Sequence, residues 1–299
     1  MAAKAQIDSA RLSNPEKVFW PDEGYTKLDL ANFYRDVFPA LQPYVKDRIL
    51  TLERCPDGML GACFYQKEKP QGLPANTPTK KIATAHGKRA VTEYVVGGSL
   101  ETQLALVNLG CIPVHVCGSR ARFFPKPDWV CFDIDPTSGK FGDAANACLL
   151  VKEALDTLEL RAFAKTSGSR GLHIFVPLKV GPSSDEVLAF ATELAARVAA
   201  AYPKELTVEH SIPARRNRVY IDVARNGKVQ TVVSPYSVRR KAKAPVSTPL
   251  EWSEVKPFLD PTKFNLGNFR TRLKSKDPWA DFFQSRQTLK NATARLKSI

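Results

Sequence analysis

Two aspartates, Asp133 and Asp135, lie one residue apart in the apolar segment WVCFDIDP at residues 129–136. Because side chains alternate between the two faces of a β-strand, both carboxylates are expected on one face and the apolar side chains on the other. A second apolar segment, VYIDV at residues 219–223, places Asp222 opposite its valines and isoleucine in the same way. If the two strands are neighbours, three carboxylates converge.

This expected cluster of carboxylates predicts a cation site. At a separation of ~4 Å, like unit charges repel by about 4 kcal/mol even at an effective dielectric constant of ~20, so the cluster requires a cation or protons. Oxygen ligands without thiolate or imidazole are typical of magnesium and manganese sites. Taken alone, an Asp-x-Asp pair before a proline more often ends a strand and caps a loop, and that alternative stays open at this point.

The segment TSGSRGLHIFVP at residues 166–177 adds a second kind of chemistry. Its glycines and serines favour a tight turn whose backbone amides can face an anion, and Arg170 contributes a fixed positive charge, which suits a phosphate group. In the strand that follows, His173 shares a face with Phe175. By itself such a turn is usually only a turn, and a lone strand histidine is more often a hydrogen-bonded structural residue.

Taken in order, these segments resemble a known family. They are the Asp133/Asp135 strand, the turn with His173, the Asp222 strand and then SPYSVR at residues 234–239. A chain with these motifs in this order resembles the polymerase domain of bacterial DNA ligase D, which belongs to the archaeo-eukaryotic primase superfamily. The segment NPEKVFWP at residues 14–21 is similar to the family's opening segment. The resemblance covers nearly the whole chain, and the ordered set of motifs is more specific than any one of them.

The resemblance implies a role for each matching residue. Asp133, Asp135 and Asp222 would hold two divalent cations, Mn²⁺ or Mg²⁺, and carry the catalysis. Nucleotide-binding roles are implied for Phe64, Tyr65, His115, Ser167, Ser169, Arg170, His173 and Arg239. Of these, the aromatic pair Phe64 and Tyr65 would stack on bases, and the other residues would hold the triphosphate. Lys17 and Lys27 match positions that grip the 5′-phosphate of a DNA end; without the match they would be ordinary surface lysines.

The implied activity is template-dependent nucleotidyl transfer. The enzyme would add nucleotides, ribonucleotides preferentially, to 3′ ends at gaps and double-strand breaks in bacterial non-homologous end joining. Its partners would be gapped or broken DNA with a 5′-phosphate, nucleoside triphosphates, a Ku-type end-binding protein and a separate DNA ligase, because no Lys-x-Asp-Gly ligase motif is found. The sequence also fits a fragment of a longer ligase, and a loop at residues 71–89 matches the family's end-holding insertion.

Two departures and two alternatives accompany this interpretation. Val223 stands where the family often has tryptophan, and Arg170 where lysine is frequent, but neither change removes a ligand. A metal-dependent nuclease would use the same carboxylates without an aromatic base platform. A scaffold that binds DNA ends without chemistry would have the fold but no working site.

Composition agrees with an acidic partner. The 299 residues include 44 Lys and Arg against 30 Asp and Glu, a formal net charge of +14, which favours nucleic acid. No apolar run of membrane-spanning length and no signal peptide are recognised, so a cytoplasmic, nucleoid-associated protein without membrane contact is expected.

The six cysteines form no Cys-x-x-Cys pair and lie mostly in apolar runs, so buried reduced thiols are expected. Alternation would place Cys111, His115 and Cys117 on one strand face, but three collinear ligands rarely close a tetrahedral zinc site. Zinc is therefore not expected.

The pattern of elements predicts an α+β fold. Helices are expected from Thr26 to about Leu41, from about Asp143, and from Ser183 to about Ala201, the first and third with capping boxes. Asn226-Gly227 predicts a hairpin whose return strand covers residues 228–233. The expected fold is a primase-polymerase fold, with an RRM-like antiparallel or mixed catalytic sheet carrying helices on one face. A closely packed N-terminal α/β lobe (residues 1–110) and a catalytic lobe (111–299) would form one domain.

Overall fold

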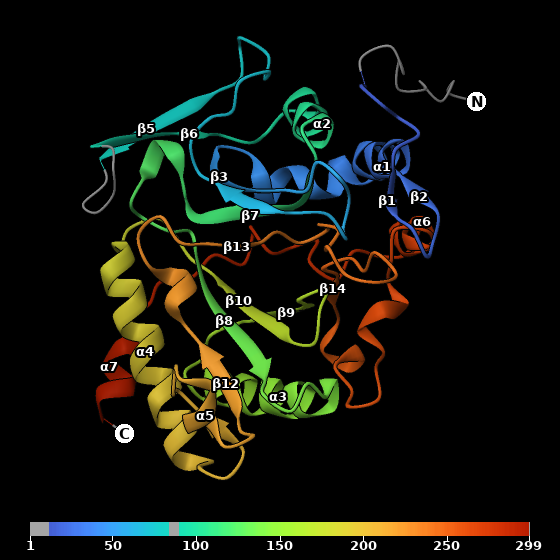
Figure 1. Cartoon of the computed structure of the whole chain (residues 1–299). Coiled ribbons are helices and arrows are strands. Elements are labelled where there is room, and N and C mark those ends of the chain that lie inside the picture. Colours follow the sequence, from blue (N-terminus) through green and yellow to red (C-terminus); the bar gives the residue numbers. More distant parts are fainter. Residues whose placement is uncertain (1–11, 84–89, 299) are drawn as a thin grey trace.

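The computed structural model describes residues 12–83 and 90–298, so part of the loop expected at 71–89 lies outside the described residues. Two sheets form the centre of the molecule (Figure 1). Two short antiparallel pairs lie outside them, one of β1 (Val18–Trp20) with β2 (Tyr25–Thr26) and one of β5 (Thr79–Ala83) with β6 (Val91–Val95). None of the helices in the described part of the chain has the length and apolarity that a membrane crossing requires.

A four-stranded antiparallel sheet has the strand order β13-β7-β3-β4. Its strands are β13 (Thr231–Val233), β7 (Cys111–Arg120), β3 (Arg48–Arg54) and β4 (Phe64–Gln66). Helices α1 (Lys27–Val45) and α2 (Leu100–Asn108) pack on each other and contact β7 (Figure 1). The predicted start of α1 is confirmed, because the Thr26 hydroxyl accepts from the Asp29 amide and the Asp29 carboxylate accepts from the Thr26 amide.

A six-stranded sheet has the strand order β11-β12-β8-β10-β9-β14, and only the β11–β12 pair is parallel. Its strands are β11 (Leu206–Thr207), β12 (Val219–Asp222), β8 (Trp129–Pro136), β10 (Leu172–Pro177), β9 (Phe163–Thr166) and β14 (Pro249–Leu250). Helices α3 (Phe141–Thr157) and α4 (Ser184–Ala201) pack against it, as predicted for a mixed α+β fold (Figure 1). The capping box of Ser183 and Glu186 opens α4.

The remaining α-helices are short; the first lies between β11 and β12, and the other two follow β14. They are α5 (Ile212–Arg215), α6 (Phe269–Leu273) and α7 (Lys290–Ser298). Between the last two, Trp279 and Phe282 stack with ring centroids 4.9 Å apart and contact Phe163 and Phe175 of the sheet. The C-terminal part of the chain therefore completes the core beneath β9 and β10.

The predicted hairpin at Asn226-Gly227 is wrong. β12 belongs to the six-stranded sheet, whereas β13 pairs with β7 in the other sheet. Asn226 ends a 3-10 turn, and its side-chain amide exchanges two hydrogen bonds, of 2.8 and 2.7 Å, with the backbone of Cys131 in β8. Gly227 has φ −64°, whereas a tight hairpin turn of the predicted type needs positive φ. The side chain thus anchors a crossover from one sheet to the other.

The two sheets are interleaved in the sequence. β7 and β13 lie beyond residue 110 and join β3 and β4, which precede it. A single large hydrophobic cluster includes residues from both sheets, such as Leu50 and Val114 from one and Phe132 and Ile174 from the other. The division into lobes near residue 110 stays a prediction about domain organisation.

Candidate active site

The register of the six-stranded sheet brings the predicted aspartates together. Asp222 on β12 is the direct cross-strand partner of Asp133 on β8, and Tyr220 is the partner of Asp135. His173 on β10 pairs with Asp133 from the other side. Directly opposed residues have Cβ atoms about 4.5–5.5 Å apart, so Asp133 lies between an acid and an imidazole on one strand face.

The two outer carboxylates contact arginines. Oδ2 of Asp222 lies 3.2 Å from Nη2 of Arg225, and Oδ2 of Asp135 lies 3.5 Å from Nη1 of Arg215. Burial, followed by the charge of Asp133, raises the pKa of Asp135 above its ordinary value. Sequence reasoning assigned no role to Arg225, although its position three residues after Asp222 is a helical-turn spacing.

Asp133 and His173 form a coupled pair, with Oδ1 of the acid 3.3 Å from Nε2 of the ring. Burial disfavours the charged carboxylate, but the contact with His173 and the charges of Arg225 and Lys165 outweigh it and hold the pKa of Asp133 below its ordinary value. Burial and the charge of Lys165 lower the pKa of His173 to about 4. The pair is therefore an ionised acid beside a neutral imidazole near pH 7.

The donor set suits a hard divalent cation. Within residues 12–83 and 90–298, no three His, Cys, Asp or Glu side chains already converge in an arrangement that could hold a metal ion. The three aspartates nevertheless offer carboxylate oxygens from one face of two adjacent strands, which is the chemistry that magnesium and manganese prefer.

The turn before β10 is closed by Ser167. Its hydroxyl accepts hydrogen bonds from the amides of Ser169 and Gly171, both 3.2 Å long. The two glycines are required by space: a Cβ on Gly168 would lie 2.5 Å from Cγ of Arg239, and one on Gly171 would lie 2.2 Å from the carbonyl oxygen of Ile134. The turn therefore packs directly against β8 between the two aspartates of that strand.

Arg239 connects this turn to the four-stranded sheet. Its Nη1 donates to the carbonyl oxygen of Ser167 at 3.2 Å. Burial lowers the pKa of Arg239, while the carboxylates of Glu53 and Asp133 oppose that effect. Because Glu53 lies on β3 and Asp133 on β8, the guanidinium is within electrostatic reach of an acid from each sheet. Arg170 is exposed and its charge reaches Asp135.

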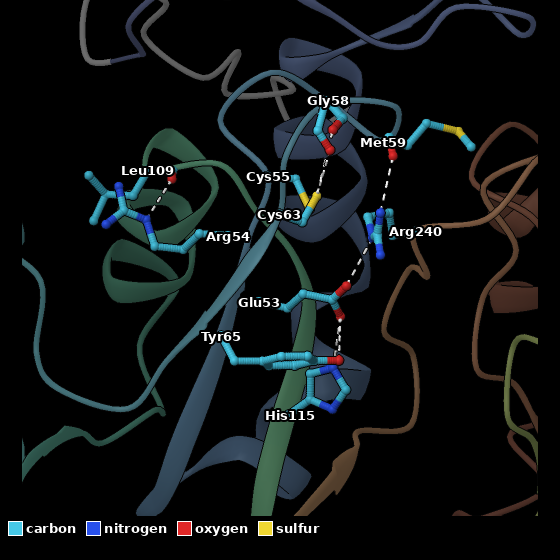
Figure 2. Close-up of a disulfide and its surroundings, with 11 residues drawn as sticks. Glu53, Arg54, Cys55, Gly58, Met59, Cys63, Tyr65, Leu109, His115 and Arg240 are labelled. Carbon is cyan, nitrogen blue, oxygen red and sulfur yellow. Dashed lines mark hydrogen bonds and ion pairs between the residues drawn. A yellow bond between two sulfur atoms is a disulfide. The ribbon is translucent and has the colours of Figure 1, made fainter.

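Glu53 is a site residue that sequence reasoning missed. Figure 2 shows its carboxylate between Arg240 on one side and Tyr65 and His115 on the other. Oε1 accepts from Arg240 at 3.0 Å, and Oε2 lies 3.3 Å from both the Tyr65 hydroxyl and Nε2 of His115. Burial works against the charge of Glu53, but His115 and Arg240 outweigh it and lower the pKa to about 2. The sequence RILTLER of β3 contains two arginines besides Glu53, so no local signal distinguished this acid.

The aromatic pair Phe64 and Tyr65 lies at the open edge of the four-stranded sheet. The two residues are 47% and 65% exposed, so neither ring belongs to the core. The Tyr65 ring lies 6.0 Å from the ring of His115, and the guanidinium of Arg54 lies 5.4 Å from the ring of Phe64. Exposed rings beside basic groups are suited to stacking on nucleic-acid bases.

The expectation that all cysteines are reduced is wrong for two of them. Cys55 and Cys63 form a disulfide that closes the loop between β3 and β4 (Figure 2). Their Cα atoms are 4.4 Å apart, within the range that a disulfide can span. The residues that follow Cys63 are Phe64 and Tyr65, so the bridge fixes the start of the aromatic edge strand. Cys111, Cys117, Cys131 and Cys148 are free and buried, as expected.

The two lysines predicted to hold a 5′-phosphate lie near each other at the start of α1. Lys17 forms an exposed ion pair with Asp57, with Nζ and Oδ1 2.5 Å apart. Lys27 is only 5% exposed, and its Nζ donates to the carbonyl oxygens of Ser13 at 2.7 Å and Asn108 at 3.0 Å. Burial and the charge of Lys17 lower the pKa of Lys27. Lys27 is therefore not an ordinary surface lysine.

Comparisons with known proteins identify the family of this chain. The family model of the LigD primase-polymerase domain matches residues 26–279. The multifunctional non-homologous end joining protein LigD of Pseudomonas aeruginosa is 30% identical over 98% of this chain and 35% of its own length. The bifunctional LigD of Bacillus subtilis is 28% identical over 91% of this chain and 44% of its own length. The chain thus spans less than half of the length of these relatives.

A solved structure shares the fold. The polymerase domain of Mycobacterium tuberculosis ligase D, in complex with DNA, superposes with a TM-score of 0.85 at 26% identity, covering 92% of this chain and 98% of that one. Fold and site together define a nucleotidyltransferase of the primase-polymerase class. The chain belongs to the LigD primase-polymerase domain family.

Proposed function

We propose that the chain is a template-dependent polymerase that extends 3′ ends of DNA at gaps and double-strand breaks in non-homologous end joining. The observation that carries the proposal is the shared register of Asp222, Asp133 and His173 on three adjacent strands. The relatives named for end joining and the DNA complex of the mycobacterial domain support it. A formal net charge of +14 supports a nucleic-acid substrate.

Divalent cations, Mg²⁺ or Mn²⁺ and two in number, would be held by Asp133, Asp135 and Asp222. When bound, they supply charge neutralisation at the triphosphate and lower the pKa of the attacking hydroxyl. The carboxylates are suited to this task because burial and mutual repulsion make a cation favourable beside them, as the raised pKa of Asp135 indicates.

The reaction forms a bond between the primer's 3′-oxygen and the α-phosphorus of the nucleotide. The bond from that phosphorus to the bridging oxygen breaks, pyrophosphate leaves, and Asp222 accepts the hydroxyl proton. Arg239, Arg170, His173 and His115 hold the triphosphate oxygens, aided by the turn of Ser167 and Ser169. Phe64 and Tyr65 stack on the incoming and templating bases, a contact that tolerates any base identity.

Recognition of the DNA end falls to Lys17 and Lys27. Nζ of Lys27 donates to the carbonyl oxygens of Ser13 and Asn108, and its positive charge lies close to that of Lys17. We further propose a preference for ribonucleotides and association with a Ku-type end-binding protein and a ligase activity, as the end-joining relatives suggest.

Primer extension tests the proposal. A labelled primer on a gapped duplex with a 5′-phosphate is incubated with Mn²⁺ or Mg²⁺ and with ribo- or deoxyribonucleoside triphosphates. Products longer by one or more templated nucleotides support the polymerase, and faster extension with ribonucleotides supports the sugar preference. Shortened products would indicate a metal-dependent nuclease. An unchanged primer, with binding of DNA ends unaffected by Asp133→Ala, would indicate a scaffold without chemistry.

A further inference from the structure

The Cys55–Cys63 disulfide has no part in the chemistry above, yet it lies at the end of the strand pair that carries the aromatic residues (Figure 2). β3 and β4 pair with Arg54 opposite Phe64. One further step in the same register places Cys55 opposite Cys63. Their Cα distance of 4.4 Å matches the spacing of about 4.5 Å between opposed residues of a non-hydrogen-bonded antiparallel pair. The disulfide therefore continues the β3–β4 ladder as a covalent cross-strand link.

β4 has little else to hold it in place. It is three residues long and lies at the edge of its sheet, so β3 is its only partner strand among the residues that the structure describes. The side chains of Phe64 and Tyr65 are exposed and bury little apolar surface. Strands of this kind open locally at a low cost in free energy. The covalent link opposes that opening at the end of β4 where the two rings follow.

The other end of the link belongs to an anchored part of the chain. Cys55 is completely buried, and its amide donates to the carbonyl oxygen of Gly110 at 2.8 Å. Between the two cysteines, the Met59 amide donates to the carbonyl oxygen of Phe19 at 2.8 Å. Neither hydrogen bond involves a sulfur atom, so both persist when the disulfide opens. Cys63 and β4, by contrast, then lose their attachment to this anchored part.

We propose that the Cys55–Cys63 disulfide is a redox switch for the base platform formed by Phe64 and Tyr65. In the oxidised protein the link holds β4 against β3. In the reduced protein β4 opens more often, so the two rings spend less time in the position that stacks on bases. The aspartates lie on the other sheet and keep their register. The effect on synthesis rests on the proposed polymerase function, whereas the opening of β4 does not.

The switching step is a thiol–disulfide exchange with a dithiol reductant. Cys55 is completely buried and Cys63 is half-buried, so a thiolate of the reductant attacks the sulfur of Cys63. The bond between the two protein sulfurs breaks, and Cys55 leaves with the electron pair and takes up a proton. The second thiolate of the reductant then displaces Cys63, which also takes up a proton. The reductant is released as its own disulfide, and two electrons have passed to the protein.

Thiol counting and hydrogen exchange test the structural part of the proposal. Alkylation of the denatured full chain should find four free thiols after exposure to air and all six cysteines after treatment with dithiothreitol. Hydrogen exchange, followed by mass spectrometry, should be faster at residues 64–66 in the reduced protein and unchanged in β8 and β10. Six free thiols after exposure to air, or equal exchange of residues 64–66 in the two forms, would overturn the inference.

Primer extension supplies the functional readout. Dithiothreitol should raise the KM for nucleotide on the order of 5-fold, the lower end of the loss for one stacked base, and leave kcat unchanged. The double variant Cys55→Ala/Cys63→Ala lacks the link, so it should have the raised KM and no response to dithiothreitol. Cys148→Ala removes a buried free thiol of α3 and is the matched control, which should respond as the unmodified protein does.

The activity results also decide between outcomes. A response to dithiothreitol that persists in the double variant would assign the effect to other cysteines and overturn the switch. Equal KM values for the oxidised and reduced forms of an active protein would overturn it as well. If the unmodified protein extends no primer, the proposed function fails, while the thiol count and the exchange of residues 64–66 still decide whether the disulfide controls β4.

Discussion

Asp133 and Asp222 face each other directly across the antiparallel strands β8 and β12. Because side chains alternate along a strand, a shift of one residue in this pairing would turn Asp222 into the core and Val223 or Ile221 into the site. The acid pair therefore exists only in one register, and the apolar residues on the opposite face of β12 hold it there.

We expect Asp133→Asn and Asp222→Asn each to lower the rate of primer extension by more than about 100-fold. Loss of a residue that only hydrogen-bonds to a metal ligand already lowers activity by up to about 100-fold, and these aspartates are proposed as the ligands themselves. Removing one of two opposed like charges should leave the melting temperature unchanged or raise it. Single-turnover extension and thermal unfolding measure the two effects. Asp156→Asn, on the exposed side of α3, is the control. Rates within threefold of the unmodified protein would contradict the assigned site.

Tyr65→Ala removes one ring of the exposed aromatic pair. Stacking on a base is worth ~1–3 kcal/mol, so the KM for nucleotide or template should rise about 5- to 150-fold. Tyr65→Phe keeps the ring, loses only the hydrogen bond to Glu53, and should stay close to the unmodified protein. Phe258→Ala removes a ring that is 86% exposed elsewhere on the surface. Equal effects of Tyr65→Ala and Phe258→Ala would refute the base platform.

Glu53 should give the stability of the fold a pH dependence. Its pKa of about 2 in the folded protein lies below its ordinary value of 4.5. Its stabilising contribution is therefore fully present above pH 4.5 and is lost as the pH falls towards 2, with a total on the order of 3 kcal/mol. Urea unfolding at several pH values should show a shallower acid slope for Glu53→Gln. The exposed Glu193→Gln is the comparison, and identical slopes for all three proteins would contradict this role.

Lys17→Ala should weaken the preference for gaps that carry a 5′-phosphate. Loss of one phosphate contact reduces the slope of log affinity against log salt by about 1. Binding to phosphorylated and unphosphorylated gaps is compared at several salt concentrations, with Lys256→Ala as an exposed lysine control. If the unmodified protein binds both gaps equally, Lys17 has no phosphate to hold. Lys27 is less suited to this test because its removal also leaves the carbonyl groups of Ser13 and Asn108 without their donor.

Gly171→Ala tests the contact between the turn and β8. The added methyl would lie 2.2 Å from the carbonyl oxygen of Ile134, so the turn must move, at a cost of ~1–3 kcal/mol of folding free energy. Since His173 follows two residues later, extension should fall as well. Gly181→Ala meets nothing closer than 4.0 Å and should be neutral in both assays. Unchanged unfolding of Gly171→Ala would show that the turn is not tightly packed.

The features that sequence could predict are local ones. The capping pairs Thr26/Asp29 and Ser183/Glu186 are three residues apart, and strand alternation alone assigned Asp133 and Asp222 to site-facing positions. These signals depend on neighbours within one turn or one strand, so the sequence carries them without knowledge of the fold.

The features that sequence could not predict depend on distant partners. Asn226 resembled a hairpin residue because its use as an anchor for Cys131, 95 residues earlier, leaves no local trace. Glu53 and Lys165 looked like ordinary charged strand residues until the register placed them beside His115 and His173. Each contact joins separate strands, and only the assembled sheets define it.

The interleaving of the two sheets has a consequence for dissection of the molecule. β13 supplies the outer partner of β7, yet it arrives more than a hundred residues later in the chain. A fragment that ends before residue 231 lacks β13, so the backbone N–H and C=O groups on one edge of β7 lose their hydrogen-bond partners. A fragment that starts after residue 110 lacks β3, which pairs with the other edge of β7. Neither fragment should fold on its own. Two co-expressed fragments should therefore restore activity only when they associate with each other during folding.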